Sequence, residues 1–422
     1  MNGFSSTIKS LFQRNREFAG FTTFVMIMCL LNPIINSING HFFVSDFKVF
    51  YLAAKNLLAG EKVYMIAFGL DSGLYKYSPM ALLFFVPYTV FSFKIAAIIH
   101  IIILSFCYWY SFLLTRKILS TWFFPGVKHE GWLLSLAVIC TLIFLVKELY
   151  LGNINILLLL LCLLALNDIL LGKQWMGGIL LGIVLLAKPF FLILILPLAL
   201  RKKFKTLTGI AITLSAGFVI PFVILGFQRS LMLHMDWIKT ILMHGSDFPS
   251  INSIDYLLHY YLFPDLSGYV QYLIIAAAGI LAGWFIIINI HREKNGIKIN
   301  RVEEGNFIIE WFLLLSIIPN VMKTDSEHFL ASIPIITFII YYIAVSRRFW
   351  MIPLMVILIF FYGGNSQDAL GRDLSYRLFL MGFIGISNLF LILMTLFLYL
   401  DFRNLKNENK LRGIDTFKKK SN

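Results

Sequence analysis

The side chains able to do chemistry in this 422-residue chain stand where apolar runs begin or end. They are carboxylates, ammonium groups, amides, a phenol and one imidazole: Asp46, Lys147, Glu148, Tyr150, Asn153, Asn155, Lys188, Lys323, Asp325 and His328. A carboxylate beside apolar helices has its pKa raised towards useful base strength, and an ammonium group stabilises negative charge that develops near it. Such a cluster beside lipid-facing helices suits an enzyme that acts on a lipid substrate.

Each of these groups also has a structural alternative. Asp46 precedes a predicted helical stretch and fits a helix N-cap, as do Asn153 and Asn155 at the head of an apolar run. Lys188 fits a structural ion pair or the capping of helix carbonyls. A lone histidine such as His328 at a helix start is often a solvated or capping residue.

The elements that must position these groups are membrane-spanning helices. The chain is 59% hydrophobic and 14% charged, with a mean hydropathy of +0.82, whereas soluble domains are about 25% charged. Disorder is excluded by the same apolar content. Because one span needs about 20 apolar residues, the length predicts an all-α polytopic membrane protein of about 12 transmembrane helices. We predict a single membrane domain over residues 1–400 and a basic cytoplasmic tail over 401–422.

Charge sets the predicted orientation. The net charge of +14 fits cytoplasmic loops that face anionic lipid better than it fits nucleic-acid binding. Basic residues before the first apolar run predict an uncleaved first span with a cytoplasmic N-terminus. The C-terminus is then cytoplasmic as well, in a bacterial plasma membrane. The outer face carries a first loop with interfacial helices (40–78) and a long loop (227–267).

The long outer loop contains an amphipathic pattern. Leu231, Met235, Ile238 and Leu242 share one helical face, with Trp237 beside it. This predicts an interfacial helix lying flat on the membrane, and it equally fits a lid over a lipid entrance or a plain connecting helix.

The topology has one ambiguity, at residues 79–93. If this run spans the membrane, residues 175–200 form one long helix with Lys188 at mid-membrane. If it lies at the outer interface, residues 175–200 form a hairpin that turns at Lys188 and Pro189. We favour the hairpin, because an unpaired lysine at the bilayer centre is costly and proline suits a helix start.

Two stretches of the first outer loop resemble glycosyltransferase family 87 of the GT-C superfamily, which includes polyprenyl-phosphate-mannose-dependent mannosyltransferases. They are S-D-F-K-V-F-Y-L-A-A-K-N-L-L-A-G-E-K-V-Y (Ser45–Tyr64) and Y-K-Y-S-P (Tyr75–Pro79). Later pieces are similar in order and spacing: G-N-I-N (Gly152–Asn155), A-K-P (Ala187–Pro189) and E-H-F-L (Glu327–Leu330). The resemblance covers residues 20–345. It departs at Asn153, where the family usually shows G-Q-x-N, and at Asn252-Ser253-Ile254, where the family often shows N-Q-S.

The resemblance implies a GT-C fold and an inverting transfer of a hexose, such as mannose, from a polyprenyl-phosphate sugar. The acceptor is a lipid or glycan hydroxyl on the outer face. Asp46 is implied as the general base. Lys188 is expected to supply positive charge to the leaving phosphate, and His328 either donates to that phosphate or orients the acceptor. Lys323 and Asp325 are weaker candidates nearby. Sugar contacts are expected from two amides and three tyrosines, the latter also fitting an interfacial aromatic belt: Asn153, Asn155, Tyr51, Tyr64 and Tyr77.

No cofactor or metal is expected. The carboxylates show no D-x-D pair, and the chain contains no glycine-rich phosphate loop. This argues for a lipid-linked donor and against a cytoplasmic nucleotide-sugar site. The expected partners are the lipid-linked donor, a lipid or glycan acceptor and membrane lipids, without nucleic acid.

Two other classes of function remain open at this point. A transporter or lipid-linked-sugar flippase would show internal repeats and ionisable groups near the midplane. A non-catalytic membrane assembly protein would tolerate the loss of Asp46.

Overall fold

The computed structural model describes residues 2–40, 42–68, 73–244, 251–263, 270–295, 300–322 and 325–407. Within these ranges the chain forms helices, without a β-strand and with one isolated bridge between Ala67 and Leu74. The predicted all-α class is therefore confirmed. Lys323, one of the expected site residues, lies outside the described residues, as does the tail beyond Asn407.

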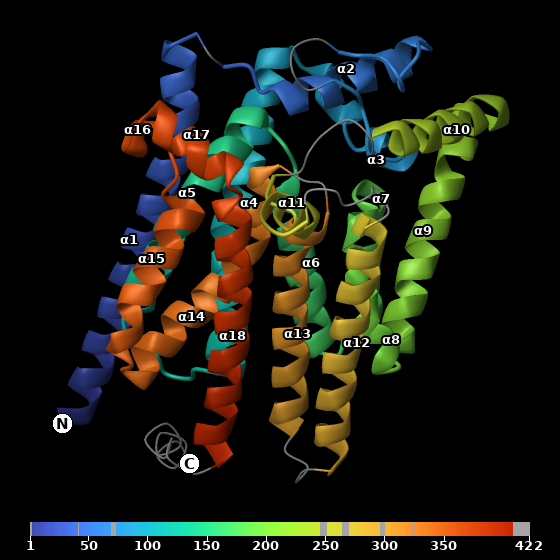
Figure 1. The fold of residues 1–422 in the computed structure, drawn as a ribbon. Helices are drawn as coiled ribbons and strands as arrows, with labels where there is room; N and C mark the ends of the chain where they lie inside the picture. The colour runs from blue at the N-terminus through green and yellow to red at the C-terminus, as the bar shows by residue number, and fades with distance from the viewer. Residues whose placement is uncertain are drawn as a thin grey trace.

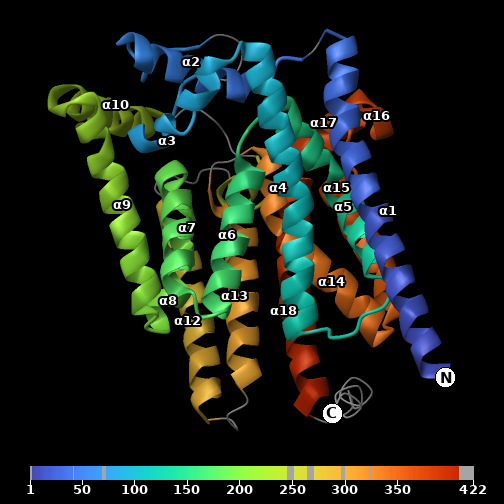
Figure 2. The same ribbon diagram turned by 180° about the vertical axis from the view of Figure 1, so that it is seen from behind.

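Long helices run side by side, and short ones lie across one end of the bundle (Figures 1 and 2). The crossing elements are α2 (Ser45–Ala59), α3 (Pro79–Leu83) and α10 (Phe227–His244). The start of α1 (Asn2–Ile38) and the end of α18 (Phe383–Asn407) are both at the opposite end of the bundle. We refer to these as the α2 end and the terminal end.

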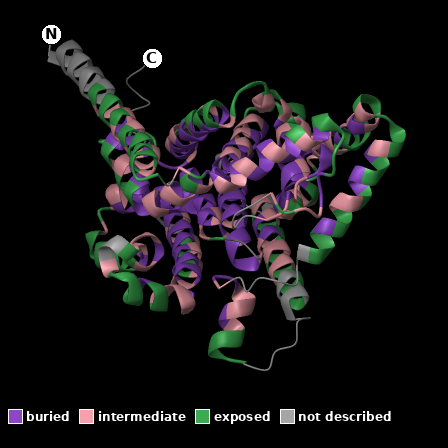
Figure 3. Cartoon of the chain, turned by 90° about the horizontal axis from the view of Figure 1, so that it is seen from above, coloured by how far each residue is buried: buried purple, intermediate pink, exposed green. Residues whose placement is uncertain are grey.

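Six helical segments are long and apolar enough to cross a membrane. They are Arg16–Ile38 in α1, α4 (Phe93–Trp122), α5 (Glu130–Leu151), α9 (Phe204–Leu225), Ser326–Ser346 and Phe383–Arg403 in α18. Seen along the bundle, exposed positions lie mostly at the periphery and buried ones inside (Figure 3). Large apolar side chains such as Ile102, Trp132 and Val223 are exposed. The chain is thus a multi-pass membrane protein, and the number of about twelve spans stays a prediction.

The remaining helices complete the bundle and its turns. They are η2 (Val86–Val90), α6 (Asn155–Leu170), α7 (Gln174–Ala187), η3 (Pro189–Leu194), α8 (Ile195–Leu200), α11 (Ile254–Tyr261), α12 (Val270–Asn295), α13 (Asn300–Val321), η4 (Ser326–Ser332), α14 (Ile333–Ser346), η5 (Phe349–Met351), α15 (Ile352–Gly363), α16 (Gln367–Leu370) and α17 (Arg372–Leu380).

The structure settles the ambiguity at residues 79–93. This segment forms the five-residue helix α3 and the short η2, and α3 lies in the layer at the α2 end (Figure 1). The segment from Gln174 to Leu200 forms α7, an extended residue at Lys188, and then η3 and α8. Pro189 stands in the first turn of η3, where a backbone N–H would have no partner within the helix, so proline removes no hydrogen bond. The predicted hairpin is confirmed.

Helix α10 covers the predicted amphipathic segment. Its apolar residues Leu231, Met235, Ile238 and Leu242 are exposed. The helix is attached to the first loop, because the Trp237 indole donates to the Lys76 carbonyl at 3.1 Å. A second attachment runs from the Arg229 guanidinium to the Leu57 carbonyl.

An ion-pair network holds the terminal end together. The Arg201 guanidinium follows α8 and donates to Glu310 of α13 at 2.5 Å and to Glu293 of α12 at 2.9 Å. The Arg201 side chain is 3% exposed and that of Glu310 1%. Three helices are therefore joined by buried charges, a geometry in which each charge depends on its partner.

Candidate active site at the α2 end

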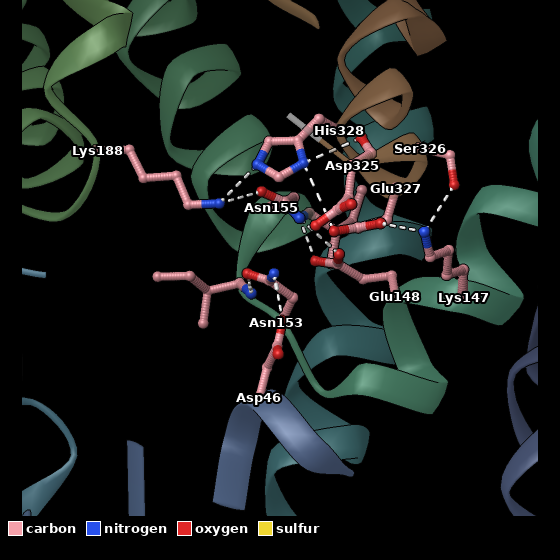
Figure 4. A network of polar contacts seen from close by, with 12 residues as sticks. Asp46, Lys147, Glu148, Asn153, Asn155, Lys188, Asp325, Ser326, Glu327 and His328 are labelled. Atoms are coloured by element: carbon pink, nitrogen blue, oxygen red, sulfur yellow. Dashed lines mark hydrogen bonds and ion pairs between the residues drawn. The ribbon is translucent and has the colours of Figure 1, made fainter. Parts of the chain in front are cut away.

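Asp46 lies in the first turn of α2 and does not cap it. The N-cap residue is Val44, in a left-handed conformation and without a side-chain cap. The Asp46 carboxylate instead accepts a hydrogen bond from the Asn153 amide at 2.7 Å (Figure 4). Burial raises the pKa of Asp46, while the Lys188 ammonium and the Asn153 hydrogen bond act in the opposite direction. A carboxylate in this setting is a stronger base than an exposed one.

Asn153 is itself held in place by the turn between α5 and α6. Gly152 ends α5 with a φ of 65°, which favours glycine. The Asn153 side-chain oxygen accepts from the Ile154 amide at 2.7 Å and from the Tyr77 hydroxyl at 3.2 Å. The partner of Asp46 thus has a fixed orientation.

Glu148 organises the start of α6. Its carboxylate accepts from the Ile156 amide at 2.9 Å and from the Asn155 side chain at 2.9 Å. The opposite face of Asn155 presents its oxygen to the Lys188 ammonium at 2.5 Å. Glu148 is fully buried, and Asn155 connects it to Lys188 through one amide group.

Lys188 and His328 meet at the centre of the site. The Lys188 Nζ lies 3.0 Å from the His328 Nε2 (Figure 4). An ammonium group only donates, so Nε2 accepts and the imidazole proton resides on Nδ1, which faces the Asp325 carbonyl at 3.2 Å. Lys188 also lies over the Tyr77 ring, 5.7 Å from its centroid. Its two hydrogen-bond partners, Asn155 and His328, are neutral groups.

Lys147 anchors the segment that carries His328. Its ammonium donates to the Ser326 hydroxyl at 3.0 Å and lies 3.2 Å from the Glu327 carboxylate. The Glu327 side chain is 1% exposed, and this ion pair joins η4 to α5 beside the packing of Phe144 against Phe329. His328 is positioned by this attachment.

The structure brings together six of the nine predicted site residues: Asp46, Asn153, Asn155, Lys188, His328 and Tyr77. Tyr64 contacts this group through Tyr77, because its hydroxyl donates to the Tyr77 carbonyl at 2.8 Å. The Tyr51 hydroxyl donates instead to the Phe91 carbonyl at 2.8 Å.

Three residues in this network were not among the nine predicted site residues: Lys147, Glu148 and Glu327. The available signal was charge inside an apolar run, since Lys147 and Glu148 interrupt residues 131–151. Buried charges of this kind in membrane helices are costly and mark functional sites. In the described part of the chain, no group of three or more His, Cys, Asp or Glu side chains is placed to hold a metal ion.

The site therefore offers a half-buried carboxylate on one side and a buried ammonium group with neutral hydrogen-bond partners on the other. The first can accept a proton, and the second can stabilise negative charge. The Tyr77 hydroxyl bonds the asparagine that serves Asp46, and the Tyr77 ring lies under Lys188, so one residue links both halves.

Comparison with known proteins agrees with this chemistry. A relative, the alpha-(1→3)-arabinofuranosyltransferase of Corynebacterium glutamicum, is 28% identical over 193 residues, which cover 44% of this chain and 44% of that protein. The chain therefore matches less than half of that relative's length. The sequence model of glycosyltransferase family 87 matches residues 75–299, more than half of the chain. This match includes the G-N-I-N turn and the Lys188 hairpin, and it shows that the chain belongs to glycosyltransferase family 87.

Proposed function

We propose that this membrane glycosyltransferase moves a hexose from a polyprenyl-phosphate sugar to a hydroxyl of a lipid or glycan, with Asp46 as the general base. One observation carries the proposal. Asp46 is a carboxylate with a raised pKa, held by Asn153 and linked through Tyr77 to the Lys188 ammonium. A base and a cation on two sides of one site are what glycosyl transfer from a lipid phosphate needs.

The reaction is a single displacement. The acceptor hydroxyl gives its proton to Asp46, and its oxygen attacks the anomeric carbon. The bond between that carbon and the phosphate oxygen breaks, and polyprenyl phosphate leaves with the electron pair. Attack from the face opposite the leaving group inverts the anomeric centre.

The leaving phosphate is stabilised by Lys188. Its ammonium has three N–H donors, two of which point to Asn155 and His328 in the structure. The third can reach the phosphate. His328 positions the ammonium through its Nε2 lone pair. Asn155 and the neighbouring tyrosines Tyr64 and Tyr77 remain proposed sugar contacts, and no cofactor is required.

The proposed donor sugar is a hexose. The resemblance in the first loop favours a hexose such as mannose. The relative from Corynebacterium glutamicum is named for arabinofuranosyl transfer, so a pentofuranose donor is the competing outcome of the same assay.

The proposed orientation places the α2 end outside a bacterial plasma membrane and both termini in the cytoplasm. The basic residues Lys202, Lys203 and Lys205 lie between α8 and the first turn of α9, at the terminal end, which fits the positive-inside rule. The proposed domain is one membrane unit over residues 1–400, with a basic tail after it.

The test is sugar transfer in purified membranes, from labelled polyprenyl-phosphate mannose and polyprenyl-phosphate arabinose. Wild type is compared with Asp46→Asn and with Asp373→Asn, a control at an exposed aspartate in the first turn of α17. We expect transfer by wild type and by Asp373→Asn, and loss of at least 100-fold in Asp46→Asn, the scale of general-base catalysis, about 10²–10⁴-fold. Equal transfer by all three proteins contradicts the assignment of Asp46.

A further inference from the structure

His100 is a buried imidazole that the mechanism above does not use. It lies in α4, is 2% exposed and contacts three segments around the site. Its Nε2 is 3.0 Å from the Gly152 carbonyl, and its Nδ1 is 3.2 Å from the Tyr88 hydroxyl. Its ring stacks on Phe47, with centroids 4.3 Å apart and planes 18° apart.

The partners of His100 fix its tautomer. The Gly152 carbonyl only accepts, so Nε2 carries the proton and donates. Nδ1 then has the lone pair and accepts from the Tyr88 hydroxyl. Both nitrogens of a neutral ring are satisfied, and the ring has one orientation that achieves this.

The segments held by this ring are the neighbours of the proposed base and of its partner. Phe47 directly follows Asp46, and Gly152 directly precedes Asn153. Asp46 and Asn153 are the two ends of the 2.7 Å hydrogen bond described above. One ring therefore contacts the chain on both sides of that hydrogen bond, at Phe47 and at Gly152, and it also contacts the Asn153 backbone.

We propose that His100 is a positioning residue. By holding Phe47 and Gly152 in fixed positions relative to each other, it sets the geometry of the Asp46–Asn153 hydrogen bond. The catalytic part of this inference rests on the proposed function. Its structural part, the link between His100 and the geometry of two distant segments, stands independently of the reaction.

The expected effect on Asp46 has a definite sign. Several titratable or charged groups influence or neighbour its carboxylate: Lys188 between α7 and η3, Asp325 and Glu327 at η4, and Lys76 and Tyr77 in the first loop. Against burial, the Asn153 hydrogen bond lowers the pKa of Asp46. Loss of that hydrogen bond raises the pKa, so less of the base is ionised at a given pH.

The experiment compares His100→Phe with a matched control, His234→Phe. Phenylalanine keeps a ring against Phe47 and removes both hydrogen bonds. His234 in α10 is likewise buried, its Nδ1 lies 2.7 Å from the Ser230 carbonyl and its ring stacks on Phe222 at 5.2 Å. Hydrogen exchange is measured on peptides covering residues 44–50 and 150–156, together with sugar transfer as a function of pH.

In His100→Phe we expect faster exchange in these two peptides, with the other spans unchanged. We expect kcat to fall roughly 10- to 100-fold, since a displacement of about 1 Å costs on that order. The KM for the donor stays within about 2-fold, because Lys188 and His328 are untouched, and the acid limb of the profile moves to higher pH. His234→Phe leaves both peptides and the pH profile unchanged.

Unchanged exchange in both peptides, or faster exchange spread evenly over the bundle, overturns the proposal whatever the activity. If His100→Phe does not fold, Tyr88→Phe removes one of the two hydrogen bonds and is expected to give a smaller change of the same sign. If Asp46→Asn retains full transfer, the proposed function fails, and the exchange result still decides the link between His100 and the two segments.

Discussion

Gly152 gives a sharp test of how closely the site depends on the packing of α2. Its φ of +65° costs an L-residue about 1–2 kcal/mol. A Cβ there would lie 2.3 Å from the Val44 Cγ1 and 2.8 Å from the Phe47 Cβ. The first distance is 1.1 Å shorter than the 3.4 Å at which ordinary contacts begin. Asp46 stands between these two residues, so Gly152→Ala displaces the proposed base.

A matched control is available at the end of α6. Gly172 has a φ of +81° with no atom within 4 Å of a built Cβ, so Gly172→Ala has the backbone cost alone. We expect Gly172→Ala to lower the free energy of unfolding by about 1–2 kcal/mol with unchanged turnover. Gly152→Ala adds a steric cost of about 1–3 kcal/mol and loses roughly 10- to 100-fold in kcat.

The assay combines thermal unfolding in detergent with sugar transfer per folded molecule. The double variant Val44→Ala with Gly152→Ala removes the nearest clashing atom and should recover part of the lost turnover. The reasoning is refuted if Gly152→Ala and Gly172→Ala show the same kcat, because the clash would then have no consequence for Asp46.

Three further predictions concern separate parts of the molecule. Lys188→Met removes the cation from the leaving phosphate and should lower kcat by about 10²–10³-fold, whereas Lys173→Met at an exposed position should not; comparable kcat values would contradict the role of Lys188. Because burial raises the pKa of Asp46, the transfer rate should fall as the pH is lowered, with a midpoint above the pKa of an ordinary aspartate. The residual activity of Asp46→Asn should lack this acid limb. A midpoint at the pKa of an ordinary aspartate would contradict the effect of burial on Asp46. Arg201→Met leaves Glu310 buried without its partner and should destabilise the fold by about 3–5 kcal/mol in thermal unfolding, with normal kcat per folded molecule; an unchanged melting temperature would show that this pair contributes nothing.

The helical hairpin could be predicted because its cause is local. Lys188 followed by Pro189 places a charge and a helix start at one point, and both disfavour a continuous span. The position of Asp46 at the start of a helix was predictable for the same reason. The first-loop motif then favoured the role of general base over that of helix N-cap for Asp46.

The contacts within the site could not be predicted from spacing. Lys188 and His328 are 140 residues apart, and Tyr77 and Asn153 are 76 apart. Their proximity depends on how the helices pack. Two tyrosines show this, because Tyr51 and Tyr77 both belong to the first outer loop and both were expected to contact the sugar. Only the fold directs one to the Phe91 carbonyl and the other to Asn153.

The neutral partners of Lys188 have a consequence for turnover. A polyprenyl-phosphate sugar is a phosphodiester with one negative charge, whereas the released polyprenyl phosphate approaches two charges at neutral pH, because its second pKa is about 6. An ammonium group whose hydrogen-bond partners are an amide and a neutral imidazole retains its attraction for anions. Under the proposed mechanism the spent lipid is therefore held more tightly than the fresh donor. Polyprenyl phosphate that accumulates in the outer leaflet then competes with the donor for the site, so removal of this lipid from the leaflet sustains turnover.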